Sequence, residues 1–207
     1  MTVSFLNRDP TRPEFWCERF EQGFVPWDSG TVPKAVQDFV FSQNGRCETN
    51  SNCLIPGCGN AYELGFLSDA GWQVTAIDFS EVAVAKAKTR LRPWADRILQ
   101  RDFFDYTPDF VLSAIYERAF FCALPPGMRP AIVARWAELL PAGGKLFGFF
   151  LLDETENAVN KGPPFRTSTK EFYALMQEHF FQLEDTEVSD SLPIFGGHER
   201  WQVWQRQ

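Results

Sequence analysis

The sequence has few of the residues that most often build metal or acid–base centres. It contains only two histidines, His179 and His198, and no pair of cysteines in a C-x-x-C arrangement. Zinc sites need closer pairing of such ligands, so we expect no metal. The chain has five cysteines, and this odd number favours free thiols in a reducing cytoplasm. These five residues are Cys17, Cys47, Cys53, Cys58 and Cys122.

Clusters of basic residues and long apolar runs are missing too. The formal net charge is −7, with no cluster of lysine and arginine. Because neutralisation of phosphates supplies most non-specific affinity for nucleic acids, the composition disfavours a nucleic-acid partner. No apolar run approaches the roughly 18 residues of a membrane span, and residues 1–13 are polar. We therefore expect no membrane segment and no signal peptide.

What the chain does have is the composition of a globular protein. Hydrophobic residues make up 44% and aromatic residues 15% of its 207 residues, with 21 Phe and 7 Trp. A chain of this length suits one domain that buries about 70% of its unfolded surface. We predict a single domain over residues 1–207, with an N-terminal segment (1–45) and a core (51–207). The expected partner is a small molecule.

Strand-like and helix-like segments alternate through the core, which is typical of βαβ units around a parallel sheet. The last two strands are joined by a short loop and should pair antiparallel. Thr31 and Ser80 are the expected N-caps of the first and third helices. The sequence predicts strands at 53–56, 72–78, 97–101, 110–116, 145–152, 181–188 and 199–205, and helices at 31–41, 61–70, 80–91, 127–140 and 169–180.

A glycine turn follows the first predicted strand. Gly57 and Gly59 match the first two glycines of a nucleotide-binding turn. Asp78 ends the next strand roughly 20 positions later, which is the spacing that places an acid at a ribose. Tyr62 stands where a dinucleotide site has its third glycine. This departure disfavours NAD and FAD and favours S-adenosylmethionine, which has no pyrophosphate. A purely structural turn is the alternative.

Two acids after predicted strands are candidate ligands of the nucleoside. Asp78 would accept hydrogen bonds from the ribose hydroxyls, although it could simply start the following helix. Asp102 would accept a hydrogen bond from the adenine amine, while Phe103 would offer a ring face to the adenine. The alternative for this second pair is an ordinary loop acid beside a core aromatic residue.

Read together, these segments resemble the thiopurine methyltransferase superfamily, which includes plant and bacterial thiol and halide methyltransferases. Pro56 stands where most methyltransferases carry an acid, a departure that this family shares. The resemblance spans nearly the whole chain and rests on Phe15-Trp16 with Arg19 and Gly23, Pro26-Trp27-Asp28-Ser29-Gly30, Pro56-Gly57-Cys58-Gly59, Asp78-Phe79-Ser80, Asp102-Phe103-Phe104, Phe120 to Pro126, Met128-Arg129, Gly162 to Phe165 and Glu199-Arg200.

The resemblance implies a Rossmann-like class I methyltransferase fold, with a mostly parallel seven-stranded sheet, an antiparallel C-terminal hairpin and an N-terminal helical lid. It also implies S-adenosylmethionine as the cofactor. Phe20 occupies a place where the family has Trp, so its ring is kept without the indole donor. The expected cofactor contacts are Trp16, Phe20, Trp27, Gly57, Gly59, Asp78, Phe79, Asp102, Phe103 and Arg118.

The acceptor side has a mixed character. The Phe120-Phe121 pair resembles the halide and thiol branch, whereas Glu117-Arg118-Ala119 resembles the thiopurine and oxyanion-resistance branch. The acceptor could therefore be hydrosulfide, a small or aromatic thiol, a halide, or a selenium or tellurium species. Expected substrate contacts are Trp27, Phe120, Phe121 and Phe165, the last on a loop stiffened by two prolines.

Methyl transfer from a sulfonium is an in-line displacement, so alignment supplies most of the catalysis. We expect no catalytic dyad and no nucleophilic cysteine. Arg118 is the expected catalytic residue, stabilising either the anionic nucleophile or the cofactor carboxylate, because it stays protonated. A surface ion pair with Glu117 or another acid is its alternative role. Trp16 and Trp27 would close a lid that excludes water, if they are not ordinary packing.

Two other classes of protein compete with this interpretation. One is an NAD-dependent oxidoreductase on a similar sheet, and the other is a methyltransferase-like scaffold that binds the cofactor without turnover. A binding preference for S-adenosylhomocysteine over NADH would exclude the oxidoreductase. Turnover on a small acceptor would exclude the non-catalytic scaffold. The resemblance slightly favours a monomer.

Overall fold

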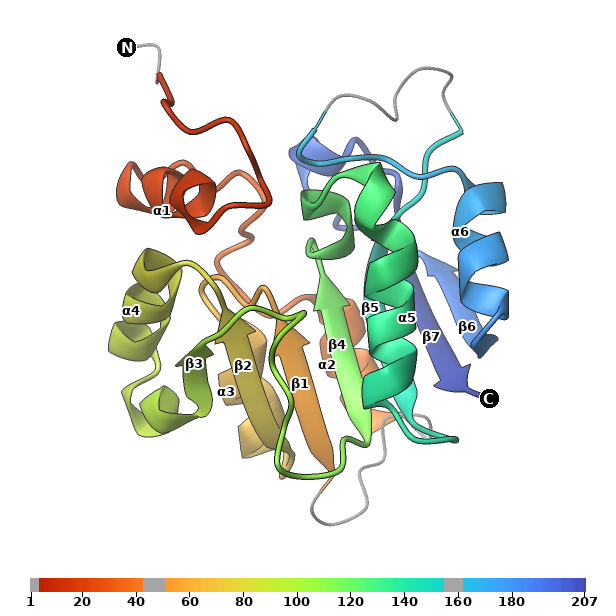
Figure 1. Ribbon diagram of the computed structural model, residues 1–207. Coiled ribbons are helices and arrows are strands. Elements are labelled where there is room, and N and C mark those ends of the chain that lie inside the picture. Colours follow the sequence, from red (N-terminus) through yellow and green to blue (C-terminus); the bar gives the residue numbers. More distant parts are fainter. Residues whose placement is uncertain (1–3, 43–50, 155–161) are drawn as a thin grey trace.

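A mixed β-sheet forms the centre of the protein. The computed structural model describes residues 4–42, 51–154 and 162–207. Its seven strands lie in the order β3-β2-β1-β4-β5-β7-β6, and β7 runs antiparallel to both of its neighbours (Figure 1). This confirms the predicted fold class. The strands are β1 (Asn52–Pro56), β2 (Gln73–Asp78), β3 (Ile98–Gln100), β4 (Ala114–Arg118), β5 (Lys145–Leu151), β6 (Phe180–Glu187) and β7 (Glu199–Arg206).

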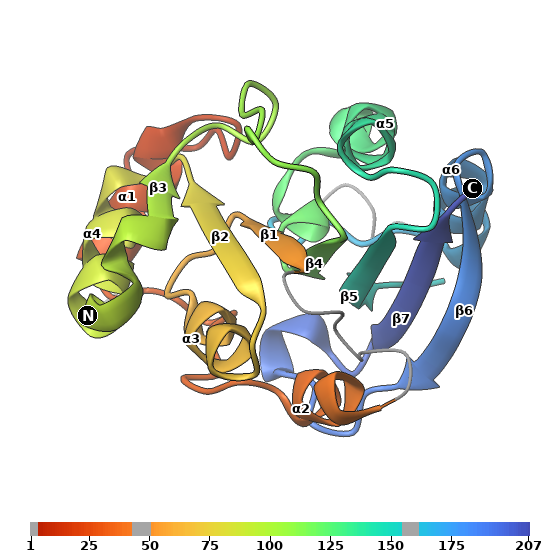
Figure 2. The ribbon, with the colours of Figure 1, turned by 90° about the horizontal axis from the view of Figure 1, so that it is seen from below.

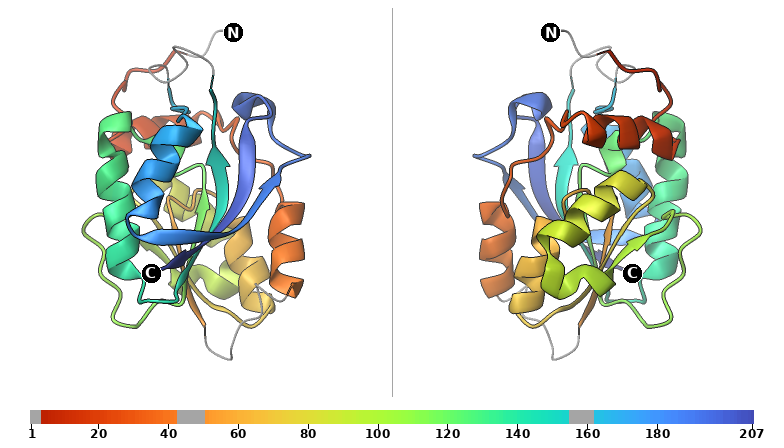
Figure 3. Two further views of the ribbon diagram at one scale, coloured as in Figure 1. Left: turned by 90° about the vertical axis from the view of Figure 1, so that its right-hand side faces the viewer. Right: turned by 90° about the vertical axis from the view of Figure 1, so that its left-hand side faces the viewer.

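Helices cover both faces of the sheet, as Figures 2 and 3 show. One core contains side chains of α2 (Lys34–Phe41), α3 (Tyr62–Asp69) and α4 (Glu81–Arg90). A second core, on the other face, contains side chains of α5 (Arg129–Leu139) and α6 (Thr169–Gln177). The largest buried side chains, Trp136, Trp201 and Trp204, belong to these two cores. The abundant aromatic residues are therefore mainly core.

The N-terminal helix α1 (Pro13–Glu21) lies beyond the carboxyl ends of the parallel strands (Figure 1). It packs on α4 through a small third core of Phe15, Trp16, Phe20 and Ala83. A cavity lies between this helix and the strand ends, at the place where ligands bind in open α/β sheets.

Capping explains where two of the helices begin. Ser80 accepts a hydrogen bond from the Ala83 amide at 3.2 Å, so its predicted role as the N-cap of α4 is confirmed. The predicted N-cap Thr31 is wrong. Helix α2 begins at Lys34, and Pro33 occupies the N-cap position without a side-chain cap, because its extended backbone (ψ 149°) places it outside the first helical turn.

The fourth strand differs from its predicted range of 110–116. It begins at Ala114, since the preceding Val111 is exposed and only Leu112 enters the core. It continues to Arg118 because Glu117 and Arg118 pair with Gly148 and Phe149 of β5. Backbone pairing therefore overrides the apolar pattern, which ends before the charged residues. Among the described residues, no helix is long and apolar enough to cross a membrane.

Candidate active site

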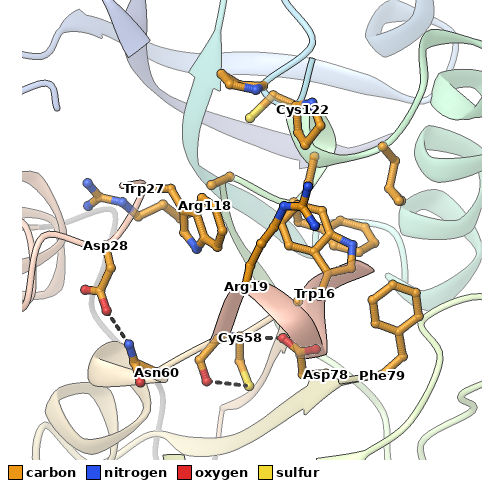
Figure 4. A pocket seen from close by; sticks show the side chains of 18 of the residues that line it. Trp16, Arg19, Trp27, Asp28, Cys58, Asn60, Asp78, Phe79, Arg118 and Cys122 are labelled. Carbon is orange, nitrogen blue, oxygen red and sulfur yellow. Dashed lines mark hydrogen bonds between the residues drawn. The ribbon is translucent and has the colours of Figure 1, made fainter. Parts of the chain in front are cut away.

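A cavity of about 430 Å³ lies between α1 and the carboxyl ends of the parallel strands. It is the size of a pocket for a small-molecule ligand. Figure 4 shows side chains from the N-terminal segment and the strand ends converging on it. All ten predicted cofactor residues line this cavity: Trp16, Phe20, Trp27, Gly57, Gly59, Asp78, Phe79, Asp102, Phe103 and Arg118.

The glycine turn after β1 forms one wall of the cavity. Gly57 has φ +56° and Gly59 has φ +51°, a left-handed conformation that favours glycine. A Cβ at position 57 would also lie 2.6 Å from Cδ2 of Phe120, so only glycine fits there. The turn thus brings bare backbone to the cavity and packs it directly against Phe120.

Asp78, at the end of β2, holds this turn in place. Its Oδ2 accepts a hydrogen bond from the Gly59 amide at 3.0 Å, and its Oδ1 accepts one from the Ser80 amide at 2.8 Å. Burial raises the pKa of Asp78 to about 6, while these two amides act to lower it. The carboxylate is therefore ionised at neutral pH, supports the start of α4 and still faces the cavity.

The segment after β3 lines the cavity next to Asp78. Oδ1 of Asp102 accepts a hydrogen bond from the Phe104 amide at 2.9 Å. The Phe103 ring is 4% exposed and meets Phe120 edge-on at 5.0 Å between centroids. Phe103 is thus both a core aromatic residue and part of the cavity wall.

Aromatic residues of the N-terminal segment cover the cavity. Trp16 meets Trp27 edge-on, with 5.4 Å between ring centroids, and its indole nitrogen donates to the Pro10 carbonyl at 2.8 Å. Asp28 accepts hydrogen bonds from the side chains of Asn60 and Tyr62, beside the glycine turn. These contacts fasten the N-terminal segment to the wall that carries Gly57 and Gly59.

Arg118, the last residue of β4, contributes a cation. Its guanidinium lies 4.5 Å over the Phe149 ring, and its Nη1 is buried without a hydrogen-bond partner among the described residues. The alternative role, an ion pair with Glu117, is not seen. Oε1 of Glu117 instead accepts the amides of Phe120 and Phe121 at 2.9 and 2.7 Å. A buried guanidinium nitrogen without a hydrogen-bond partner is costly.

Two predicted acceptor residues lie away from the cavity wall. Phe121 is 3% exposed and stacks on Trp136 of α5 at 5.6 Å, because the turn after β4 sends successive side chains in different directions. Phe165 packs against Gly162, and its amide donates to the Cys122 carbonyl at 2.6 Å. Gly162, Pro163 and Pro164 line the cavity in its place. Lys161 of the same predicted loop lies outside the described residues.

Sequence reasoning missed two residues of this wall, Ile194 and Phe195. They belong to a short 3-10 turn, Pro193–Phe195, before β7. No motif marks this turn. The only signal is an apolar pair in a polar connection just before Gly196-Gly197. With Ala119, Phe120 and Cys122 these residues give the acceptor side an apolar surface.

The two cysteines on the cavity wall are protonated thiols. Burial raises the pKa of both Cys58 and Cys122 well above the ordinary value. The negative charge of nearby Asp78 also raises the pKa of Cys58. Glu117 and Glu199 raise the pKa of Cys122 in the same way. Since the thiolate is the nucleophilic form, neither is suited to covalent catalysis. Cys47 lies outside the described residues.

These features fit S-adenosylmethionine. A buried carboxylate faces the cavity where a ribose is bound in such folds, and the glycine turn leaves room for a ligand against the backbone. Arg118 adds a buried guanidinium nitrogen with no partner among the described residues, which suits an anion. The fold is that of the class I methyltransferases. One structure that it resembles is the 1,6-didemethyltoxoflavin-N1-methyltransferase of Burkholderia thailandensis, solved with S-adenosylhomocysteine: the TM-score is 0.74 with 15% identity, covering 99% of this chain and 93% of that one.

The model of the family "Thiopurine S-methyltransferase (TPMT)" matches residues 11–207, so the chain belongs to the thiopurine methyltransferase family. It is 30% identical to the probable thiol methyltransferase 2 of Arabidopsis thaliana over 76% of this chain and 69% of that protein. It is 27% identical to thiocyanate methyltransferase 1 of the same plant, over 92% and 84%. The protein is thus an S-adenosylmethionine-dependent methyltransferase, and the family match decides against the oxidoreductase interpretation.

Proposed function

We propose that this protein transfers a methyl group from S-adenosylmethionine to a small, soft nucleophile such as a thiol, hydrosulfide, aromatic thiol, halide, or selenium or tellurium species. The observation that carries the proposal is the direct contact between the two sides of the cavity, where Phe120 of the apolar wall packs on Gly57 of the glycine turn. The names of the relatives, a thiol and a thiocyanate methyltransferase, point to the same acceptor class.

The cofactor supplies an electrophilic methyl group on a sulfonium. Asp78 would accept hydrogen bonds from its ribose hydroxyls, and Asp102 with Phe103 would bind its adenine. Trp16, Phe20, Trp27 and Phe79 would close the site around it, and Gly57 and Gly59 would allow backbone approach. Their common role is to hold two reactants in line, which can supply roughly 7–11 kcal/mol of barrier reduction.

The acceptor wall excludes water from the reacting atoms. It is formed by Ala119, Phe120, Cys122, Ile194 and Phe195, whose side chains carry no charge once the Cys122 thiol is protonated. A hydrated oxygen nucleophile loses much of its solvation at such a surface, whereas a large, polarisable sulfur or halide anion loses less. The wall therefore favours soft acceptors that ionise without help from a side-chain base.

We propose further that the chain, residues 1–207, acts as a monomeric single domain in the cytoplasm, with residues 1–45 as a lid on the core of 51–207. Four free cysteines among the described residues suit a reducing compartment.

The test is turnover on a panel of acceptors. Pure protein is incubated with S-adenosylmethionine and hydrosulfide, a small thiol, an aromatic thiol or iodide, and S-adenosylhomocysteine formed above the acceptor-free blank is measured. We expect turnover on at least one sulfur acceptor. Calorimetric binding of S-adenosylhomocysteine without turnover on any acceptor would instead identify a non-catalytic scaffold.

Arg118→Ala tests the cationic residue. We expect kcat/KM to fall about 100-fold, as when one preorganised donor is removed from an active site. The control is Arg92→Ala, since Arg92 is exposed on the 3-10 helix Arg92–Arg97. Unchanged kinetics in Arg118→Ala would exclude Arg118 from the site.

A further inference from the structure

A polar corner of the cavity contains Glu63, a buried carboxylate in addition to Asp78. This residue lies in the first turn of α3, directly after the glycine turn, and is 8% exposed. The hydroxyl of Tyr116, in β4, donates a hydrogen bond to Glu63 Oε1 at 3.0 Å. Both residues line the cavity together with Arg118. A carboxylate, the hydroxyl that orients it and a guanidinium therefore share one corner.

The two charges of this corner influence each other without forming an ion pair. Burial raises the pKa of Glu63, and Arg118 and the Tyr116 hydroxyl act to lower it. None of the ion pairs among the described residues includes Glu63 or Arg118. A buried charge needs a partner. A cation and an anion that face one cavity but remain unpaired are complementary to a ligand that carries both charges.

Once the ribose and the acceptor are assigned to other parts of the cavity, one part of the cofactor remains to be placed in this corner. Asp78 stands at the ribose position, and the acceptor wall is apolar. The remaining part of S-adenosylmethionine is its α-amino-carboxylate, which is a zwitterion. Figure 4 shows Arg118 and Asp28 on the side of the cavity away from Asp78 and Phe79. Arg118 is thus separated from the ribose acid Asp78 in this view.

We propose that Glu63, oriented by the Tyr116 hydroxyl, accepts hydrogen bonds from the α-ammonium group of the cofactor, opposite Arg118, which pairs with its carboxylate. This inference rests on the proposed function of the site. Glu63 is a cofactor-binding residue in this proposal, and Tyr116 is a positioning residue that acts through it.

Asp28 adds a second negative charge on the lid side of the same corner. It lies close enough to Glu63 to raise the pKa of that carboxyl. Its own carboxylate accepts hydrogen bonds from Gly30, Asn60 and Tyr62, so it is held in place as a fixed charge. The two carboxylates attract an ammonium group to the Glu63 side, while the Arg118 guanidinium attracts a carboxylate, and this sets the orientation of the zwitterion.

The test compares two ligands that differ only at this end of the molecule. S-adenosylhomocysteine carries the amino-carboxylate, whereas 5′-methylthioadenosine keeps the adenine, the ribose and the thioether sulfur but lacks it. In Glu63→Gln we expect the calorimetric Kd for S-adenosylhomocysteine to rise roughly 10-fold to 100-fold, as for a lost charge-assisted hydrogen bond. The Kd for 5′-methylthioadenosine should stay at the wild-type value. Glu81→Gln, at an exposed acid in the first turn of α4, is the matched control.

Tyr116→Phe removes the orienting hydroxyl and leaves the charge of Glu63 in place. We expect a several-fold weaker Kd for S-adenosylhomocysteine and an unchanged Kd for 5′-methylthioadenosine. An equal loss for both ligands in Glu63→Gln, or no loss for either, would overturn the inference, because the role of Glu63 would then be structural or absent. Wild-type protein that binds neither ligand would refute the proposed function itself.

Discussion

The cavity has two halves that are built in different ways. The cofactor half lies at the ends of β1, β2 and β3 and consists of backbone, carboxylates and aromatic residues from short continuous motifs. The acceptor half lies beyond β4, β5 and β7 and is apolar. Its wall combines the turn after β4 with residues 162–164 and with Pro193–Phe195, segments that are far apart in the sequence.

This difference separates what must stay constant from what can vary. The cofactor half binds one fixed molecule, and its buried acid Asp78 has defined hydrogen-bond partners in Gly59 and Ser80. In the proposed function, the acceptor half only needs to exclude water and fit the shape of a small nucleophile. Loops on a rigid scaffold are suited to that task.

The largest expected effect tests where the acceptor half ends and the core begins. Phe121→Ala should destabilise the protein by about 3–5 kcal/mol, because it empties a buried site against Trp136 and Phe172. Phe120→Ala should cost less stability and raise the KM of the acceptor, since Phe120 lines the cavity. Urea unfolding and steady-state kinetics of the two variants measure the contrast. A stable Phe121→Ala enzyme with a raised acceptor KM would reverse the assignment.

The next effect should be confined to the cofactor half. Asp78→Asn removes the charge that would face the ribose, and we expect the Kd for S-adenosylhomocysteine to rise about 100-fold. Wild-type affinity should improve as the pH rises through about 6, where Asp78 ionises, and the variant should lack this dependence. Calorimetry at several pH values measures both quantities, with the exposed Asp96→Asn as the control.

At saturating cofactor, Asp78→Asn should leave the KM of the acceptor unchanged. A large change in that KM would show that the two halves are not separable. Thermal unfolding identifies any variant whose glycine turn has lost its support.

The smallest expected effect, for a change of one pH unit, concerns stability around the turn after β4. Burial raises the pKa of Glu117 to about 8, with a contribution from Glu199. The folded state therefore keeps a proton that the unfolded chain releases near its ordinary value of 4.5. The resulting stability is fully present below about pH 4.5 and is lost, at about 1.4 kcal/mol per pH unit, as the pH rises to about 8.

Glu117→Gln should abolish this part of the pH dependence while keeping an oxygen for the amides of Phe120 and Phe121. Urea unfolding at pH 5 to 8 should show the variant gaining stability over wild type as the pH rises. The exposed Glu21→Gln serves as the control. Parallel curves for Glu117→Gln and wild type would mean that Glu117 is already ionised at pH 5.

Part of the cofactor half could be predicted from the sequence because the glycine turn and the acid after the next strand are local. A glycine turn after a strand and an acid at the end of the next strand define their own geometry, and every predicted cofactor residue lines the cavity. The sheet also followed from local pattern, except that β4 begins four residues later than predicted, at Ala114, and the N-cap of α2 is Pro33. Those details depend on pairing with β5 and on backbone angles.

The acceptor half could not be predicted in the same way. Phe120 and Phe121 look equivalent in the sequence, and only the turn held by Glu117 sends one into the cavity and the other into the core. Ile194 and Phe195 reach the wall through the return of the chain into β7. Long-range packing of this kind leaves no periodic or motif-based signal.

The contact between Gly57 and Phe120 has a consequence for how such an enzyme changes over evolutionary time. Residues 162–164 and 193–195 reach the wall from independent loops, so they can drift and alter acceptor preference without disturbing the cofactor turn. Position 120 is different, because its ring is also the neighbour that requires glycine at position 57. Divergence in the family should therefore proceed through the distant loops, and a directed library at those loops should broaden the acceptor range while the affinity for the methyl donor is preserved.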